Sequence, residues 1–125
     1  MIDARYLLDS NICIYLLEGN APALRDRVER HVPGEIVTSA IAVGEVLIGA
    51  QRRGHIDKAL LLFQTFTALP YDLDAARAYA SLSFKRASFD RLIAAHALAL
   101  GLTLVTNNER NFIDIDGLRT ENWTR

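Results

Sequence analysis

Short apolar runs alternate along the chain with longer segments in which apolar residues recur every three or four positions. Because strands covered on both faces read as continuous apolar sequence, the runs predict buried strands at residues 5–8, 36–38 and 102–106. Weaker strands are expected at 69–71 and 118–120. The periodic segments predict helices beginning near residue 12 and at 21–31, 39–51, 56–67, 72–84 and 89–100. Strands that alternate with helices indicate a parallel sheet covered on both faces.

Capping residues set several of the expected helix ends. Ser39 and Ser88 stand where a helix N-cap is needed, and Asp72 or Asp74 opens the helix between them. Gly54 and Gly101 follow the last periodic residues and are expected to stop their helices.

Length and composition indicate one folded domain covering residues 1–125. Half of the residues are apolar and 23% are charged, which excludes global disorder. Fourteen basic against fifteen acidic residues leave a net charge of -1, so any contact with nucleic acid must come from a local patch. A single cysteine, Cys13, excludes a disulfide framework and a cysteine zinc cluster. With no membrane-spanning or leader pattern, we expect a cytoplasmic protein.

Asp9 follows the first predicted strand, and Asn107 and Asn108 follow the strand at 102–106. In parallel α/β folds ligands bind beyond these carboxyl ends. The simpler interpretation of Asp9 is an N-cap of the next helix.

Glu45 is the only charged residue between Glu35 and Arg52, and its helical neighbours include Ile41 and Ile48. This pattern predicts a buried face, where an ionised carboxylate costs several kcal/mol unless a cation or strong donors compensate it. The alternative is a glutamate at the margin of that face that reaches solvent.

Asp90 lies in the first turn of its predicted helix, with Ile93, Ala94 and Ala97 on its own side. A favourable interaction with the helix dipole would explain it equally well. Three acids from three elements together favour a site for a hard cation, Mg²⁺ or Mn²⁺.

Five segments resemble PIN-domain ribonucleases of the VapC toxin type, in order and over nearly the whole chain. They are YLLDSN at 6–11, TSAIAVGE at 38–45, FDRLIAAHA at 89–97, LVTNN at 104–108 and ENW at 121–123. The resemblance implies a three-layer α/β/α fold with a central, mostly parallel sheet. It also implies a Mg²⁺-dependent endoribonuclease, a hydrolase acting as the toxin of a type II toxin-antitoxin pair. Such toxins are usually homodimers inhibited by a VapB-type antitoxin, in a heterotetramer or larger complex.

On this resemblance Asp9, Glu45 and Asp90 match the first three acidic positions of the family and are expected to bind the metal. Asn108 stands where many relatives carry a fourth acid, and it completes the expected catalytic set. Ser10, Asn11 and Thr106 are expected to orient these groups by hydrogen bonds. The segment from Tyr79 to Asp90 is shorter than in many relatives, so substrate contacts from that region are not transferred.

Lys85, Arg86 and Arg91 flank Asp90, and Arg110 follows the asparagine pair, so these residues could form a phosphate-binding rim. Solvated helix surface is the simpler interpretation. His96 is expected to be a satisfied, half-buried histidine without a serine or cysteine partner, which leaves no nucleophile pair. Tyr15, Phe63 and Tyr79 have core spacing and are not expected to stack on bases.

Two other functions fit parts of the pattern. A phosphoacceptor signalling domain also carries an acid after its first strand, but it needs a late lysine after a strand, and only Lys58 and Lys85 exist. A catalytically inactive PIN-like interaction domain is favoured by Asn108. The helix at 56–67 is a candidate for the partner groove, although core packing explains it equally well.

Overall fold

A computed structural model of the protein describes residues 3–82 and 88–125. These residues form five strands, six α-helices and one 3-10 helix. The strands are β1 (Tyr6–Leu8), β2 (Ile36–Ser39), β3 (Ala68–Leu69), β4 (Thr103–Val105) and β5 (Thr120–Glu121). The helices are α1 (Ser10–Glu18), α2 (Pro22–Glu29), α3 (Ala40–Arg53), α4 (Ile56–Thr65), α5 (Leu73–Ser81), α6 (Phe89–Leu100) and the 3-10 helix η1 (Glu109–Phe112).

The sheet has the order β3-β2-β1-β4-β5, and each neighbouring pair is parallel. The predicted α/β class with a parallel sheet is therefore confirmed. The central strand β1 has β2 on one side and β4 on the other, so the direction of winding reverses beside β1. Such a switch point is where ligands bind in open α/β sheets.

The two edge strands lie slightly away from their predicted positions. β3 comprises residues 68–69 rather than 69–71, because Pro70 has no N–H to continue the ladder, while the Thr38 N–H already bonds to the Thr67 carbonyl at 2.9 Å. β5 comprises residues 120–121 rather than 118–120. Leu118 belongs to the preceding turn, where its N–H bonds to the Ile115 carbonyl at 3.4 Å.

Side chains cap the helices where the sequence predicted. Ser39 accepts from the Ile41 N–H at 3.1 Å, Ser88 from the Arg91 N–H at 3.3 Å, and Asp72 from the Ala75 N–H at 3.0 Å. Asp72 rather than Asp74 is thus the N-cap of α5. Gly101 ends α6 with φ of 69°, a left-handed conformation that glycine adopts without strain. α4 and α5 end at Thr65 and Ser81, earlier than expected, because Phe66 and Leu82 are extended.

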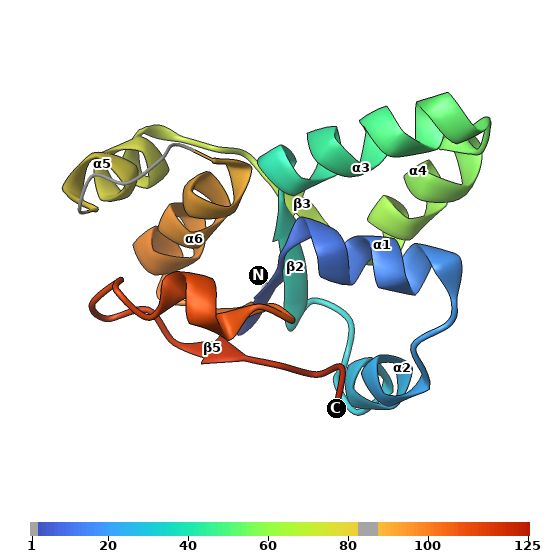
Figure 1. The fold of residues 1–125 in the computed structure, drawn as a ribbon, viewed down its shortest axis with the longest axis horizontal. Helices are drawn as coiled ribbons and strands as arrows, with labels where there is room; N and C mark the ends of the chain where they lie inside the picture. The colour runs from blue at the N-terminus through green and yellow to red at the C-terminus, as the bar shows by residue number, and fades with distance from the viewer. Residues whose placement is uncertain (1–2, 83–87) are drawn as a thin grey trace.

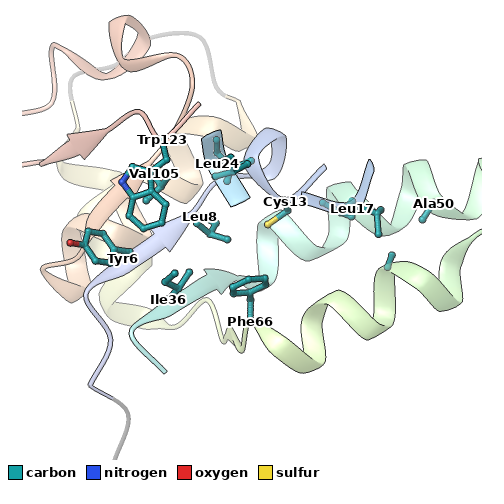
Figure 2. Packing of buried hydrophobic residues seen from close by; sticks show 13 residues of the cluster. Tyr6, Leu8, Cys13, Leu17, Leu24, Ile36, Ala50, Phe66, Val105 and Trp123 are labelled. Atoms are coloured by element: carbon teal, nitrogen blue, oxygen red, sulfur yellow. The ribbon is translucent and has the colours of Figure 1, made fainter. Parts of the chain in front are cut away.

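Alternate residues of β1 face two hydrophobic clusters, which gives the predicted three layers. Tyr6 and Leu8 pack with α1, α2 and α4 on one face, whereas Leu7 packs with α6 on the other. Figure 1 shows the sheet between α6 on one side and α1 on the other. In the first cluster Trp123 is fully buried near Tyr6 and Val105, so the C-terminal segment is part of the core (Figure 2). No helix in the described part of the chain has the length and apolar character needed to cross a membrane.

Candidate active site

The register of the sheet places Asp9 at the switch point. Leu8 pairs with Thr38 on one side and with Val105 on the other, so Asp9 and Thr106 follow directly at the same edge. The Asp9 N–H continues the ladder to the Val105 carbonyl at 3.1 Å. Its carboxylate accepts from the Ile12 N–H at 3.0 Å and hydrogen-bonds to the Thr106 side chain. Asp9 is therefore the N-cap of α1 and also a buried acid at the sheet edge.

Burial dominates the electrostatics of Asp9, which is only 3% exposed. The pKa of the Asp9 carboxyl is raised to about 6, mainly by burial and to a smaller extent by the negative charges of Asp90 and Glu45, against the opposing hydrogen bonds of Thr106 and Ile12. Burial also raises the pKa of Asp90. The fold thus brings Asp90 and Glu45 within electrostatic range of Asp9.

Glu45 is half-buried on α3, but the face that carries it is not the buried face that the sequence predicted. Ile48, one turn further on, is 53% exposed, because α3 turns Ala42, Val46 and Ala50 into the core instead. The compensation expected for Glu45 comes from a neighbouring element. Ser10, which is buried at the start of α1, donates its hydroxyl to Glu45 Oε1 at 2.5 Å.

Glu45 and Asp90 share the wall of a pocket of about 530 Å³. Its other lining residues are Tyr79, Ser88, Phe89 and Leu92. The core placement expected for Tyr79 is thus incomplete, since part of its side chain faces this pocket. Phe89 directly precedes Asp90 in the chain, but sequence spacing did not indicate Tyr79, because it comes from a different helix and nothing local marks it as a neighbour of the acids.

The remaining predicted hydrogen-bonding residues lie around this edge. Thr106 is buried, and its hydroxyl accepts from the Asn108 N–H at 3.1 Å. Asn108 itself is exposed at the start of η1, and Asn11 is exposed on α1. Arg110 is exposed and lines a different pocket, next to Ile113 and Leu118.

Arg91 does not belong to a phosphate-binding rim, and it is not solvated helix surface. It is only 8% exposed, and its guanidinium binds the Asp114 carboxylate through two hydrogen bonds of 3.0 and 3.4 Å. The charge of Arg91 is therefore paired within the fold with Asp114. Asp114 lies 23 residues away in the chain, so sequence spacing did not reveal it. Lys85 and Arg86 lie outside the described residues.

His96 has the serine partner that the sequence did not reveal. Its Nδ1 hydrogen-bonds to Ser39 Oγ at 2.8 Å, and the two side chains are 1% and 0% exposed. Burial lowers the pKa of His96, against the opposing effects of Asp72 and the Pro70 backbone. A substrate cannot reach a pair enclosed in this way, so the pair is structural.

The chemistry of the acids fits a hard divalent cation. The candidate ligands are all carboxylate oxygens, and a cation would relieve the burial and mutual repulsion that oppose ionisation of Asp9. Within residues 3–82 and 88–125, no three His, Cys, Asp or Glu side chains already form a group that could hold an ion. Ser10 hydrogen-bonds to the Glu45 carboxylate, which would have to turn for the three acids to meet at one ion.

Comparison with known proteins agrees with this geometry. The PIN domain family matches residues 6–118. The tRNA(fMet)-specific endonuclease VapC of Shigella flexneri is 31% identical over 131 residues, which cover 96% of this chain and 98% of that protein. Ribonuclease VapC2 of Haemophilus influenzae is 31% identical over 130 residues, covering 95% and 98%.

Solved structures show the same fold. The DNA-bound VapBC crystal structure from Salmonella typhimurium superposes with a TM-score of 0.84 at 27% identity, covering 96% of this chain and 98% of that one. VapBC2 from Rickettsia felis, bound to a promoter DNA fragment, gives 0.82 at 26% identity, covering 94% and 98%. With its family match, its sheet order and its acids at the switch point, the chain belongs to the PIN domain family, among proteins of the VapC type.

Proposed function

We propose that this protein is a Mg²⁺-dependent endoribonuclease that acts as the toxin of a type II toxin-antitoxin pair. The observation that carries the proposal is Asp9, a carboxylate buried at the switch point of the sheet and within electrostatic range of Asp90 and Glu45. Buried acids with raised pKa values are typical of catalytic sites. The VapC relatives are named as ribonucleases or endonucleases, which supports RNA as the substrate.

In the proposed site Asp9 and Asp90 hold Mg²⁺ together with Glu45, and Mn²⁺ fits the same oxygen ligands. When bound, the ion would lower the pKa of the attacking water and neutralise negative charge on the phosphoryl oxygens. Thr106 and the Ile12 N–H keep the Asp9 carboxylate in place. Ser10 occupies one oxygen of Glu45, which leaves the other oxygen to orient the attacking water and accept its proton. Asn108, exposed beside Thr106, is proposed to hydrogen-bond to the RNA.

The proposed partner is a VapB-type antitoxin, because the solved relatives include VapBC complexes. We also propose a homodimer of the toxin within a heterotetramer or larger complex, as the resemblance to VapC toxins implies. We propose that the protein acts in the cytoplasm, because its proposed substrate, RNA, is available there.

A phosphoacceptor signalling function is disfavoured by the fold. Flavodoxin-like signalling domains have the strand order 2-1-3-4-5, whereas this sheet has the order β3-β2-β1-β4-β5. A catalytically inactive interaction domain is the remaining alternative, and a test of cleavage decides between it and the nuclease.

Purified protein incubated with a structured RNA transcript is expected to cleave it in Mg²⁺ and not in EDTA. Asp9→Asn and Asp90→Asn should each lower the cleavage rate by roughly a hundredfold or more, since each removes a charge that acts on the transition state. The matched control is Asp26→Asn, at an exposed position on α2, which should cleave like the wild type. Cleavage that survives in both site variants, or that EDTA leaves unchanged, would contradict the proposal.

A further inference from the structure

The pocket beside the acids has a composition that cleavage of a phosphodiester does not by itself require. Among the lining residues that the structure describes, two are the acids Glu45 and Asp90, and two are the aromatic residues Tyr79 and Phe89. We propose that this pocket binds one unpaired nucleobase of the RNA substrate, stacked against Phe89 and Tyr79. The inference rests on the proposed nuclease function and adds a base-binding subsite to it.

Phe89 is the clearest sign of a ligand. It is 53% exposed, and it is the one aromatic side chain of the described residues that is more than about a third exposed. Phe89 occupies the first position of α6, directly after the N-cap, where helix formation does not call for an aromatic residue. An exposed ring at the mouth of a pocket is explained by something that covers it.

The position of Phe89 relative to the acids is fixed by the helix start. Ser88 caps the first turn through the Arg91 N–H at 3.3 Å, and Asp90 follows Phe89 directly in the chain. Arg91 is anchored to Asp114, which holds the same turn from the other side. A base on Phe89 and a phosphate at Asp90 would therefore have a set spacing.

Tyr79 supplies the second aromatic wall from another helix. It lies near the end of α5, which packs against α6, and it is only partly buried. Leu92, one turn after Phe89, adds apolar surface to the pocket. Aromatic and apolar walls with few polar groups are typical of sites for flat organic ligands, and about 530 Å³ lies within the usual range of roughly 300–1,000 Å³.

Two features favour a nucleobase as the occupant. Unpaired RNA bases are commonly recognised by stacking on aromatic side chains. In the proposed site Glu45, Asp90 and their metal ion engage the phosphate, so the neutral base is the part of the nucleotide left for the aromatic walls of the pocket. A second pocket of about 500 Å³, beside η1, offers no comparable stacking surface, because the aromatic residue that lines it, Phe112, is only 3% exposed.

The test begins with the cleavage site, mapped on a structured transcript with the wild-type enzyme. A complete lack of Mg²⁺-dependent cleavage at this step would reject the proposed function, and the base-binding subsite with it. If cleavage occurs, a short single-stranded RNA that spans the mapped site is made in an intact form. Further forms carry one abasic nucleotide at each position next to the cut.

One abasic position is expected to raise the KM of the wild type by roughly tenfold to a hundredfold, the size that the loss of one stacked base produces. Phe89→Ala should raise the KM for intact RNA by a similar factor and should have no further effect on that abasic RNA. Phe89→Trp, which keeps a stacking surface, should restore tight binding. The control is Leu61→Ala, at a residue 62% exposed on α4, and it should behave like the wild type.

Binding is measured separately from cleavage with 2-aminopurine at the critical position. Its fluorescence should be quenched on binding to Asp9→Asn and not on binding to the double variant Asp9→Asn with Phe89→Ala. The subsite is rejected, with the nuclease function left standing, if Phe89→Ala cleaves intact RNA with the wild-type KM. Equal weakening of intact and abasic RNA by Phe89→Ala would reject it in the same way.

Discussion

Asp9 is a carboxylate that the fold keeps out of water and within electrostatic range of two other acids. In the absence of a cation this placement opposes ionisation, which is why its pKa rises to about 6 from an ordinary value of 3.8. A shift of this size corresponds to about 3 kcal/mol against the ionised form at neutral pH. The residue therefore lowers the stability of the metal-free protein, as expected where function rather than folding sets a side chain.

Asp9→Asn is predicted to stabilise the metal-free protein at neutral pH by about 1–2 kcal/mol, since Asn keeps the cap to the Ile12 N–H and removes the buried charge. Because the folded pKa is raised, the native state holds the proton more tightly than the unfolded state. Stability of the wild type should therefore fall as the pH rises from about 4 to about 6. Urea unfolding in EDTA at pH 4.0 and pH 7.5 measures both effects.

The control for this prediction is Asp26→Asn on the exposed surface of α2, which should shift stability little at either pH. If Asp9→Asn is less stable than the wild type at pH 7.5, or if the difference between them does not change with pH, burial of a charged Asp9 is not the cause of its raised pKa.

At the scale of elements, two serines perform the same local role in different surroundings. Ser39 caps α3 and Ser88 caps α6, each by accepting a backbone N–H. Ser39 is fully buried and also hydrogen-bonds to His96, whereas Ser88 is exposed at the pocket. Comparing Ser88 with Ser39 therefore separates the contribution of a helix cap to stability from the contribution of a buried hydrogen bond.

Ser88→Ala is predicted to lower the free energy of unfolding by about 1 kcal/mol, the usual effect of losing a cap. Ser39→Ala should lower it by about 2–4 kcal/mol, because it also leaves the buried His96 Nδ1 without its partner, which adds about 1–3 kcal/mol. Urea unfolding of the two variants at pH 7.5 measures the difference. Equal losses would show that the bond between Ser39 and His96 contributes nothing to stability.

Elements with local signals were predictable from the sequence. The caps Ser39 and Ser88 and the stop glycines Gly54 and Gly101 act through residues two to four positions away, so the ends of α3 and α6 follow from the sequence. The partners of Arg91 and His96 were missed because they are distant in the chain, although His96 was correctly predicted to be a satisfied histidine. Asp114, which binds Arg91, lies 23 residues further along the chain, after η1. Ser39, which hydrogen-bonds to His96, lies 57 residues earlier, at the end of β2.

At the scale of the whole molecule, the parallel sheet aligns the ends of separate strands at one edge. Alternation of strands and helices predicted that edge, and with it the neighbourhood of Asp9 and Thr106. The sequence pattern did not predict which face of α3 is buried. Apolar residues stand on both sides of Glu45, so their positions do not reveal which side packs into the core. Exposed Ile48 and the contact from Ser10 place Glu45 at a margin that faces the pocket.

The central claim is that the carboxylates of Asp9, Glu45 and Asp90 together hold a divalent ion. Anomalous diffraction from crystals soaked in Mn²⁺ tests it most directly, since the ion is located without reference to activity. The account predicts an anomalous peak within about 2.1–2.2 Å of oxygens from Asp9 and Asp90, and its loss in Asp9→Asn. Well-ordered carboxylates with no peak between them, or a peak that persists unchanged in Asp9→Asn, would contradict it.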